Sequence, residues 1–264
     1  MIKDLIKALR HKGVSSIAIQ EIMEKYSSDL LQHLAPILHQ RNLTDTECAQ
    51  LAHAANAALH YSQEGEDLVL ERLLGKQEGG FFVDVGAHHP TRFSNTYALY
   101  RRGWRGINID ATPGSMPVFA RLRPLDINIE AAVSDTVAPM AFHIFKESAL
   151  NTFDADLAES YVQAGWERLE IRTVTPRRLA DILDEHPLPD RGIDLMNIDV
   201  EGGEMGVLRS NNWGKYAPRY LMVEVLDTPL FEIMHTPVIM FLREHGYVPI
   251  SKLVHTVILR QLEQ

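Results

Sequence analysis

The stretch FFVDVGAHHPTRFSN, residues 81–95, constrains the fold more than any other part of this chain. An apolar run from Phe81 to Val83 ends in a carboxylate, Asp84, and a turn residue, Gly86, follows two positions later. Unbroken apolar runs are typical of buried parallel strands, and open α/β sheets bind ligands just beyond the carboxyl ends of their strands. Because glycine lets a ligand approach the backbone closely, this stretch predicts a nucleotide or nucleoside site.

Composition narrows the class of protein further. With 264 residues, 45% of them hydrophobic, the chain can bury one sizeable core and carry a small appendage. Its net charge of -9 repels a phosphate backbone, so we expect no nucleic-acid partner. The single cysteine, Cys48, excludes an internal disulfide framework and any multi-thiolate metal site. No apolar run is long enough to span a membrane, and the charged start does not resemble a signal peptide, so the cytoplasm is the expected location.

The first 60 residues differ in character from the rest. Residues 1–60 are expected to form an N-terminal helical region, because apolar residues recur there at helical spacing and residues 44–47, TDTE, form a capping-box pattern. These helices either pack on the main domain, which we favour, or serve as a lid, a substrate-selecting cap or an oligomer contact. Apolar faces on residues 14–39 would suit a homodimer or internal packing equally.

From residue 61 to residue 264 strands and helices alternate. Ser62 and Gly75 are placed to begin and end the first helix. The remaining pattern predicts strands at 81–85, 106–110, 128–133, 169–174, 193–199 and 220–225, an extended arm at 140–145, a closing pair at 247–250 and 254–259, and helices at 95–102, 116–122, from Thr175-Pro176, 203–208 and 237–245. Such alternation indicates right-handed βαβ units, hence an α/β domain with a mostly parallel sheet and an antiparallel edge.

Carboxylates recur where the predicted strands end. Asp84 closes the first strand, Asp110 the second and Asp199 a later one, with Glu201 two residues on. Burying an unpaired carboxylate costs several kcal/mol, so their repetition points to one polar crevice at the carboxyl edge of the sheet. Asp110 follows Asp84 at about the spacing at which an acidic residue reaches the ribose of a nucleoside. A helix cap is the alternative role for Asp110.

The turn after the first strand distinguishes two cofactor classes. A dinucleotide site needs G-x-G-x-x-G so that backbone amides can approach a pyrophosphate. The corresponding positions here are Gly86, His88 and Arg92, so two of the three glycines are missing. A nucleoside cofactor without phosphates needs only the tight turn, and a nearby carboxylate can pair with an ammonium group. S-adenosylmethionine therefore fits this turn better than NAD.

Several motifs together resemble a known family. The segments FVDVGAHHPTRFSNTY, WRGINIDATPGSM, AAVS, MNIDVEGGEMGVL and LMVEV, in that order, resemble the FkbM family of class I S-adenosylmethionine-dependent methyltransferases. YSQEGEDLVLERLL is similar to the opening helix of many members. The resemblance covers residues 61–250. It implies a Rossmann-like sheet of seven strands in the order 3-2-1-4-5-7-6, with strand 7 antiparallel, and methyl transfer to oxygen, often a sugar hydroxyl.

The resemblance also assigns cofactor contacts. It places Asp84 and Gly86 at the methionine end of the cofactor, Asp110 at the ribose, and residues 130–132 beside the adenine. The implied cofactor-binding positions are Asp84, Gly86, Ala87, Asn95, Asp110, Ala111, Glu130, Ala131 and Ala132. His88 departs from the class I glycine pattern, which leaves the course of this loop open.

Methylating an alcohol needs help from the protein. An alcohol is a poor nucleophile at neutral pH, so transfer requires a general base or a divalent cation that acidifies the hydroxyl. The candidate catalytic residues are Asp199, Glu201, Glu224 and His88, with His89 as the alternative histidine. Three of these, Asp199, Glu201 and Glu224, can instead hold magnesium or manganese, which prefer oxygen ligands. The structural alternatives are a helix cap for Glu201, a purely structural role for Glu224 and a scaffold role for one histidine.

These observations lead to one expected function and two alternatives. The expected protein is a cytoplasmic S-adenosylmethionine-dependent O-methyltransferase that acts on a small-molecule or glycan acceptor, a saccharide hydroxyl in particular. An NAD(P)-dependent oxidoreductase and a non-catalytic nucleoside-binding protein are the alternatives. A mere binding protein has little need for Asp199 and Glu201 together, which favours an enzyme.

Overall fold

A computed structural model describes residues 60–75 and 77–262 of the chain. These residues belong to the second of two units, His60–Gln264. The helices and the dimer contact predicted within the first 59 residues lie outside the described part. In the part that is described, no helix is both long enough and apolar enough to cross a bilayer.

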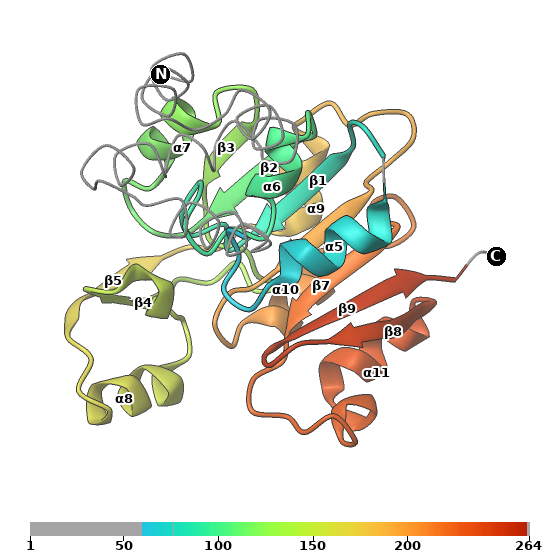
Figure 1. Cartoon of the computed structure of the whole chain (residues 1–264). Helices are drawn as coiled ribbons and strands as arrows, with labels where there is room; N and C mark the ends of the chain where they lie inside the picture. The colour runs from blue at the N-terminus through green and yellow to red at the C-terminus, as the bar shows by residue number, and fades with distance from the viewer. Residues whose placement is uncertain (1–59, 76, 263–264) are drawn as a thin grey trace, which may run out of the picture. The chain divides into compact units, whose positions relative to one another are not determined.

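Seven strands form the central sheet. Their order is β3-β2-β1-β6-β7-β9-β8, and the sheet lies in the middle of the unit (Figure 1). The strands are β1 (Phe81–Val85), β2 (Arg105–Asp110), β3 (Ile127–Glu130), β6 (Leu195–Ile198), β7 (Tyr220–Glu224), β8 (Tyr247–Lys252) and β9 (Thr256–Gln261). Neighbours pair in parallel except for β9, which runs antiparallel to both β7 and β8. This order and this single antiparallel strand are those that the family resemblance implies.

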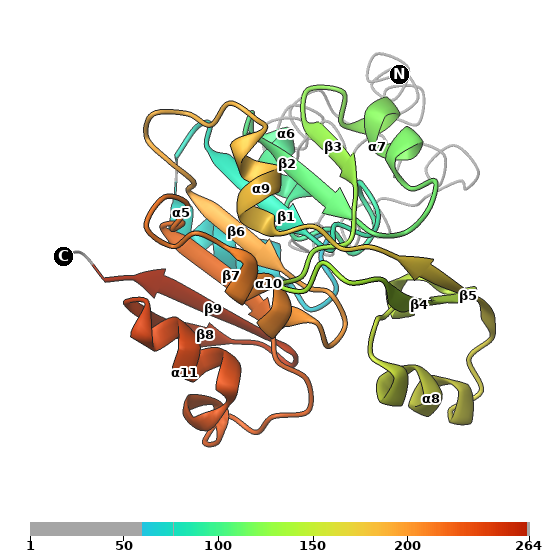
Figure 2. The ribbon, with the colours of Figure 1, turned by 180° about the vertical axis from the view of Figure 1, so that it is seen from behind.

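Helices cover both faces of the sheet, because each buried strand alternates its side chains between two cores. The helices are α5 (Glu66–Leu74), α6 (Tyr97–Arg101), α7 (Met116–Leu122), α9 (Leu179–Asp184), α10 (Glu204–Ser210) and α11 (Pro237–Glu244), with a short 3-10 turn, η2 (Ile233–His235), before the last. Phe82 of β1 packs with side chains of α5 and α6, whereas Val83 packs with side chains of α9, α10 and α11. The two views from opposite sides show these two helical layers (Figures 1 and 2).

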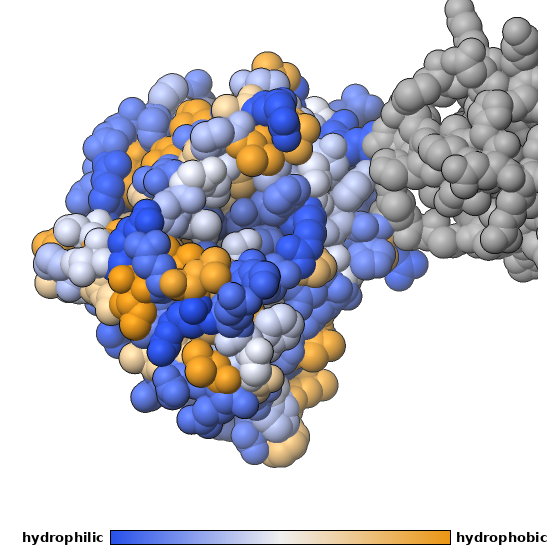
Figure 3. All heavy atoms as spheres, turned by 90° about the vertical axis from the view of Figure 1, so that its left-hand side faces the viewer, coloured by the Kyte–Doolittle hydropathy of each residue, from blue (hydrophilic) through white to orange (hydrophobic). Residues whose placement is uncertain are grey.

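The segment of the chain that follows β3 and precedes β6 forms a separate arm that projects from the sheet. It contains β4 (Met140–Phe145), η1 (Ser148–Leu150), α8 (Ala155–Gln163) and β5 (Arg168–Val174), and its two strands pair only with each other, antiparallel. The sequence pattern predicted the strand at 169–174 correctly, but it did not predict that this strand pairs with β4. Figure 3 faces this side of the molecule and shows hydrophobic surface interrupted by hydrophilic side chains. Leu169 and Ile171 of β5 are more than half exposed, at 59% and 54%.

The predicted helix start at Thr175-Pro176 is wrong. Helix α9 begins at Leu179, because the segment before it stays extended beside Val133. The backbone N–H of Arg177 donates to the carbonyl of Ala132 (2.9 Å), and the Arg177 carbonyl accepts from the N–H of Ser134 (3.0 Å). A helix cannot include a residue whose backbone groups are committed to a bridge of this kind. The third strand is also shorter than predicted and ends at Glu130.

Candidate active site

The turn after β1 brings two strand ends into contact. The N–H groups of Gly86 and Ala87 both donate to the Ile109 carbonyl, at 2.9 and 3.1 Å, which fastens the turn to β2. Gly86 has φ 82°, and a Cβ at this position would lie 1.6 Å from the carbonyl oxygen of Asp199. Only glycine satisfies both conditions. The loops after β1 and β6 are therefore in backbone contact at the centre of the sheet's carboxyl edge.

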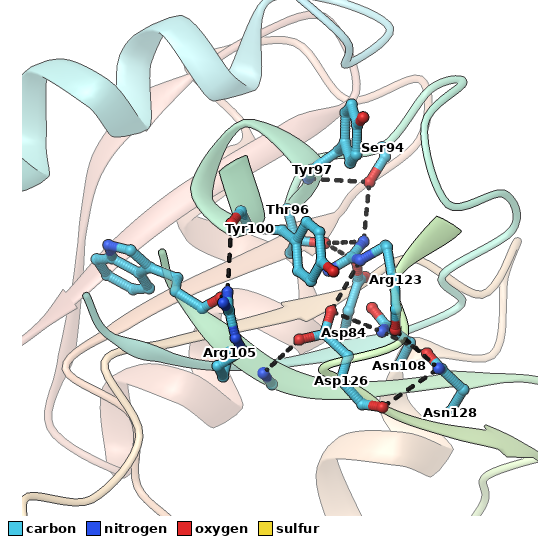
Figure 4. Close-up of polar contacts among 12 residues, drawn as sticks. Asp84, Ser94, Thr96, Tyr97, Tyr100, Arg105, Asn108, Arg123, Asp126 and Asn128 are labelled. Atoms are coloured by element: carbon cyan, nitrogen blue, oxygen red, sulfur yellow. Dashed lines mark hydrogen bonds and ion pairs between the residues drawn. The ribbon is translucent and has the colours of Figure 1, made fainter. Parts of the chain in front are cut away.

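A row of polar side chains crosses the sheet one step before this edge. Asn128, Asn108, Asp84 and Asn197 occupy matching register positions on β3, β2, β1 and β6. Asn108 donates to Asn128 Oδ1 (2.8 Å), so this buried amide in an apolar strand has its partner on the neighbouring strand of the sheet (Figure 4). Asn197 donates to Asp84 Oδ1 (2.9 Å).

A buried arginine, Arg123, is connected to this row through Thr96. Arg123 is fully buried, and its Nε lies 2.8 Å from Asp126 Oδ2 in an ion pair (Figure 4). Its Nη1 donates to Thr96 Oγ1 (3.0 Å) and to Ser94 Oγ (3.5 Å), and the Thr96 hydroxyl donates in turn to Asp84 Oδ2 (2.5 Å). Burial raises the pKa of Asp84, against the opposing effects of Thr96 and Arg123. Asp84 lines the crevice, but the protein already engages both of its oxygens. Neither Thr96 nor Arg123 was predicted from the sequence.

Asp110 ends β2 with its carboxylate held by two loops. Its Oδ2 accepts from the backbone N–H of His88 and its Oδ1 from that of Thr112, both at 2.7 Å. Burial raises the pKa of Asp110, and the two backbone donors oppose this effect. Each carboxylate oxygen accepts more than one hydrogen bond, so Asp110 retains acceptor capacity for a ligand hydroxyl.

One crevice follows the carboxyl edge of the sheet. Of the predicted cofactor positions it is lined by Asp84, Gly86, Ala87, Asn95, Asp110, Ala111, Ala131 and Ala132. Glu130 does not line it, and its carboxylate accepts from the backbone N–H of Gly114 (2.8 Å). From the arm, Ser148, Ala149 and Asn151 also line it. Sequence reasoning missed Met140, Phe142 and Phe153 of the arm and the group Gln63, Glu64, Glu66, His255 and Thr256. Part of that group belongs to the YSQEGED segment, which the resemblance already covered.

The three predicted metal-ligating carboxylates gather in this crevice. One carboxylate oxygen from each of Asp199, Glu201 and Glu224 lies within 4.8 Å of the other two. Burial and mutual repulsion raise the pKa of Asp199 well above its usual value and that of Glu224 to about 11. Burial raises the pKa of Glu201 to about 7, against the effect of a hydrogen bond from Tyr161. Three carboxylates this close repel one another, so either one of them carries a proton or a cation lies among them.

Glu201 is held in an uncommon backbone conformation. Its φ is 54°, in the left-handed region that glycine favours. Its side chain does not cap α10: the N-cap of this helix is Gly203, and no side chain makes a cap hydrogen bond there. Glu204 Oε1 instead holds the loop before the helix by accepting from the N–H groups of Val200 (3.2 Å) and Gly202 (3.1 Å). The helix-cap role considered for Glu201 is therefore not the one it has. Strain of this kind persists at functional sites where the surroundings hold it.

The two histidines after β1 differ in their surroundings. His89 Nδ1 accepts from the backbone N–H groups of Thr91 (3.2 Å) and Arg92 (3.0 Å), which is a scaffold role. His88 lines the crevice, and burial with the nearby Arg92 lowers its pKa to about 4. Its ring stacks on Phe93 of the same loop, with ring centroids 6.2 Å apart, and the cluster of Asp199, Glu201 and Glu224 does not include it.

Comparison with known proteins now decides the family. Residues 84–249 match the profile of the methyltransferase FkbM domain, which is more than half of the chain. The chain belongs to the FkbM methyltransferase family. It is therefore an enzyme, a methyltransferase that uses S-adenosylmethionine. A search of the curated proteins found no significant match.

Solved structures similar to this FkbM methyltransferase are remote. A TehB-like SAM-dependent methyltransferase from Corynebacterium glutamicum is 9% identical, with TM-score 0.39, over 83% of this chain and 97% of that one. A precorrin-6y C5,15-methyltransferase from Geobacter metallireducens is 15% identical, with TM-score 0.37, over 77% and 90%. A SAM-dependent methyltransferase from Aquifex aeolicus is 13% identical, with TM-score 0.30, over 74% and 90%. Likenesses this distant decide nothing about the acceptor.

The crevice of this FkbM methyltransferase suits the charge of S-adenosylmethionine. Seven carboxylates line it, and its lining contains no lysine or arginine from the described part of the chain. The sulfonium and the ammonium of the cofactor are both cationic, and carboxylates stabilise them. A dinucleotide would place two negative phosphates against the same wall. The site chemistry thus agrees with the family and opposes the oxidoreductase alternative.

Proposed function

We propose that this methyltransferase transfers its methyl group to a hydroxyl oxygen, and that the acceptor is a saccharide or a sugar-bearing metabolite. The observation that carries this proposal is the cluster of Asp199, Glu201 and Glu224, which lies in the same crevice that Gly86 lines. Oxygen acceptors need a group that removes a proton, whereas a site for soft, easily ionised acceptors has no use for three converging carboxylates.

In the proposed reaction Glu201 is the general base. The cofactor supplies a sulfonium methyl, a strong electrophile, so that holding the acceptor in line at about 3 Å contributes much of the rate. Glu201 accepts the hydroxyl proton as the new oxygen–carbon bond forms and the sulfur–carbon bond breaks, which releases S-adenosylhomocysteine. Glu224, with its pKa raised to about 11, is neutral near pH 7 and can donate a hydrogen bond to the acceptor.

The polar lining supports a polyhydroxyl acceptor. Gln63, Ser94, Ser148, Asn151 and Thr256 add amide and hydroxyl groups to the carboxylates around the crevice. Groups of this kind donate to and accept from sugar hydroxyls. An anionic acceptor would instead meet the seven carboxylates.

The cofactor site is tested by an Asp110→Ala variant. We expect the variant to bind S-adenosylhomocysteine at least about tenfold more weakly than the wild type, because a hydrogen bond to a charged group is lost. Isothermal titration calorimetry of both proteins measures this difference. An Asp190→Ala variant, which changes an exposed carboxylate away from the crevice lining, should bind as the wild type does.

NADH, titrated in parallel, should give no heat of binding. Equal affinity of the Asp110→Ala variant and the wild type would remove Asp110 from the cofactor site. Binding of NADH without binding of S-adenosylhomocysteine would overturn the assignment of the crevice. Transfer of a radiolabelled methyl group to neutral mono- and oligosaccharides then tests the acceptor class.

A divalent cation is a second way in which the same cluster can work. Three carboxylates within 4.8 Å offer the hard oxygen ligands that magnesium and manganese prefer, and a cation would relieve the repulsion among them. Asp199, Glu201 and Glu224 would hold the ion, which would acidify and orient the acceptor hydroxyl. We propose this arrangement as the alternative to a metal-free general base.

Manganese binding distinguishes the two arrangements. If the cluster is a metal site, the wild type should bind Mn²⁺ stoichiometrically, and a Glu224→Gln variant should bind it about tenfold more weakly or worse. Electron paramagnetic resonance of free Mn²⁺ measures both affinities without an acceptor. Full activity after exhaustive chelation would contradict the metal arrangement and leave Glu201 as the base.

We also place the enzyme in the cytoplasm. A single cysteine among 264 residues suits a reducing compartment.

A further inference from the structure

A hydroxyl from the arm contacts the proposed base directly. The Tyr161 hydroxyl, on α8, donates to Glu201 Oε2 at 2.7 Å. This is the one hydrogen bond that the Glu201 side chain makes within residues 60–75 and 77–262. The arm is otherwise a separate two-stranded sheet, so this contact connects two parts of the structure that share no strand.

The direction of this hydroxyl is set by packing. Asp154 caps α8 by accepting from the N–H groups of Asp156 and Leu157, both at 2.9 Å. The Tyr161 ring lies edge-on to Phe145 of β4, with ring centroids 5.8 Å apart. Burial and the charge of Glu201 raise the pKa of Tyr161, so the hydroxyl remains a donor throughout the physiological range.

A second hydroxyl of the arm holds the backbone of the same residue. Thr152, which is fully buried, donates from Oγ1 to the Glu201 carbonyl at 2.6 Å. Thr152 is itself tied to His143 of β4 by two backbone hydrogen bonds, at 2.8 and 3.2 Å. The arm thus contacts Glu201 at its backbone and at its side chain. This is the surrounding structure that a residue with φ 54° requires.

We propose that Tyr161 is a positioning residue: it fixes the Glu201 carboxylate through Oε2 and so leaves Oε1 free to take the acceptor proton. This inference rests on the proposed O-methyltransferase function and adds to it the group that orients the base. The arm therefore takes part in catalysis as well as lining the crevice. Tyr161 does not itself line the crevice, so it acts through Glu201.

A double-mutant cycle tests the proposal. We expect Tyr161→Phe to lower kcat for methyl transfer to a neutral saccharide mixture by about tenfold or more, with KM for S-adenosylmethionine unchanged. In a Glu201→Gln background, Tyr161→Phe should lower kcat by less than about twofold, because the side chain that Tyr161 orients is then no longer a base. Equal losses in the two backgrounds would show a merely structural role and overturn the proposal.

A matched control loses a tyrosine hydroxyl elsewhere. Tyr247 is buried and donates to the Pro218 carbonyl at 2.7 Å, away from the crevice lining. Tyr247→Phe should therefore leave kcat within about twofold of the wild type. The same reduction in Tyr247→Phe and Tyr161→Phe would also overturn the proposal, because it would reflect a general effect of losing a buried hydroxyl.

A measurement without an acceptor separates this inference from the proposed function. The ¹³C chemical shift of the Glu201 carboxyl carbon, assigned by its absence from the Glu201→Gln spectrum, should move in Tyr161→Phe and stay in Tyr247→Phe. An unmoved resonance in Tyr161→Phe would overturn the positioning role. Absence of methyl transfer to any saccharide by a wild type that binds S-adenosylhomocysteine would instead contradict the proposed acceptor class.

Discussion

Replacing Glu201 with glutamine is expected to lower the rate of methyl transfer by about a hundredfold or more, because the amide cannot accept the acceptor's proton. The fold and the affinity for S-adenosylhomocysteine should stay the same, since glutamine keeps the size of the side chain and Glu201 makes no cap hydrogen bond to α10. Radiolabelled methyl transfer measures the rate, and calorimetry measures the affinity. Unchanged turnover would remove Glu201 from the mechanism.

The pH dependence of kcat is a second test of Glu201 as the general base. Because burial raises the pKa of Glu201 to about 7, the ionised base accumulates as the pH rises through about 7. Wild-type kcat should therefore rise with pH in this range, and the residual rate of Glu201→Gln should not. An Glu232→Gln variant, which changes an exposed carboxylate after β7, should keep both the wild-type rate and its profile.

Replacing Gly86 with alanine is expected to be the most damaging change to the fold of the crevice. The added Cβ would lie 1.6 Å from the Asp199 carbonyl oxygen, and the backbone φ of 82° disfavours any L side chain. We expect a loss of about 3 kcal/mol in the free energy of unfolding and at least a tenfold loss of cofactor affinity. Urea unfolding followed by tryptophan fluorescence measures the first, and calorimetry the second.

Gly192 provides a matched control for this change. Its φ of 79° is nearly the same, but a Cβ there would meet nothing within 4 Å. Gly192→Ala should therefore cost only the backbone strain of a left-handed residue, about 1 kcal/mol, and should leave cofactor affinity unchanged. Similar losses of stability in the two variants would show that the loops after β1 and β6 do not pack as closely as described.

Local features of the sequence were enough to predict the sheet and one wall of the crevice. Parallel strands end at the same edge of a sheet, so carboxylates at the ends of neighbouring strands lie near one another. This reasoning brought Asp84, Asp110 and Asp199 to one crevice before any contact was known. The turn at Gly86 was predicted in the same way, because a glycine directly after a strand indicates a tight turn without reference to distant residues.

Residues that act from a distance were missed because no local pattern marks them. Arg123 lies 27 residues from Thr96 along the chain and looks like an ordinary helix-terminal arginine in the sequence. The strand at 168–174 carries a sound strand pattern, yet its partner is β4 rather than the main sheet. Pairing depends on where the preceding segments leave the chain, and periodicity carries no information about that.

The sequence by itself therefore determined the α/β fold, the strand order implied by its family and part of the lining of the crevice at the carboxyl edge. Tertiary structure alone decided which of those residues are free to react. Tyr161, 40 residues before Glu201, donates a hydrogen bond to its carboxylate, and Glu204 holds the loop between Glu201 and α10 by accepting from the N–H groups of Val200 and Gly202. The physical reason is that a carboxylate's pKa and orientation depend on its burial and its donors, and both come from segments far away in the chain.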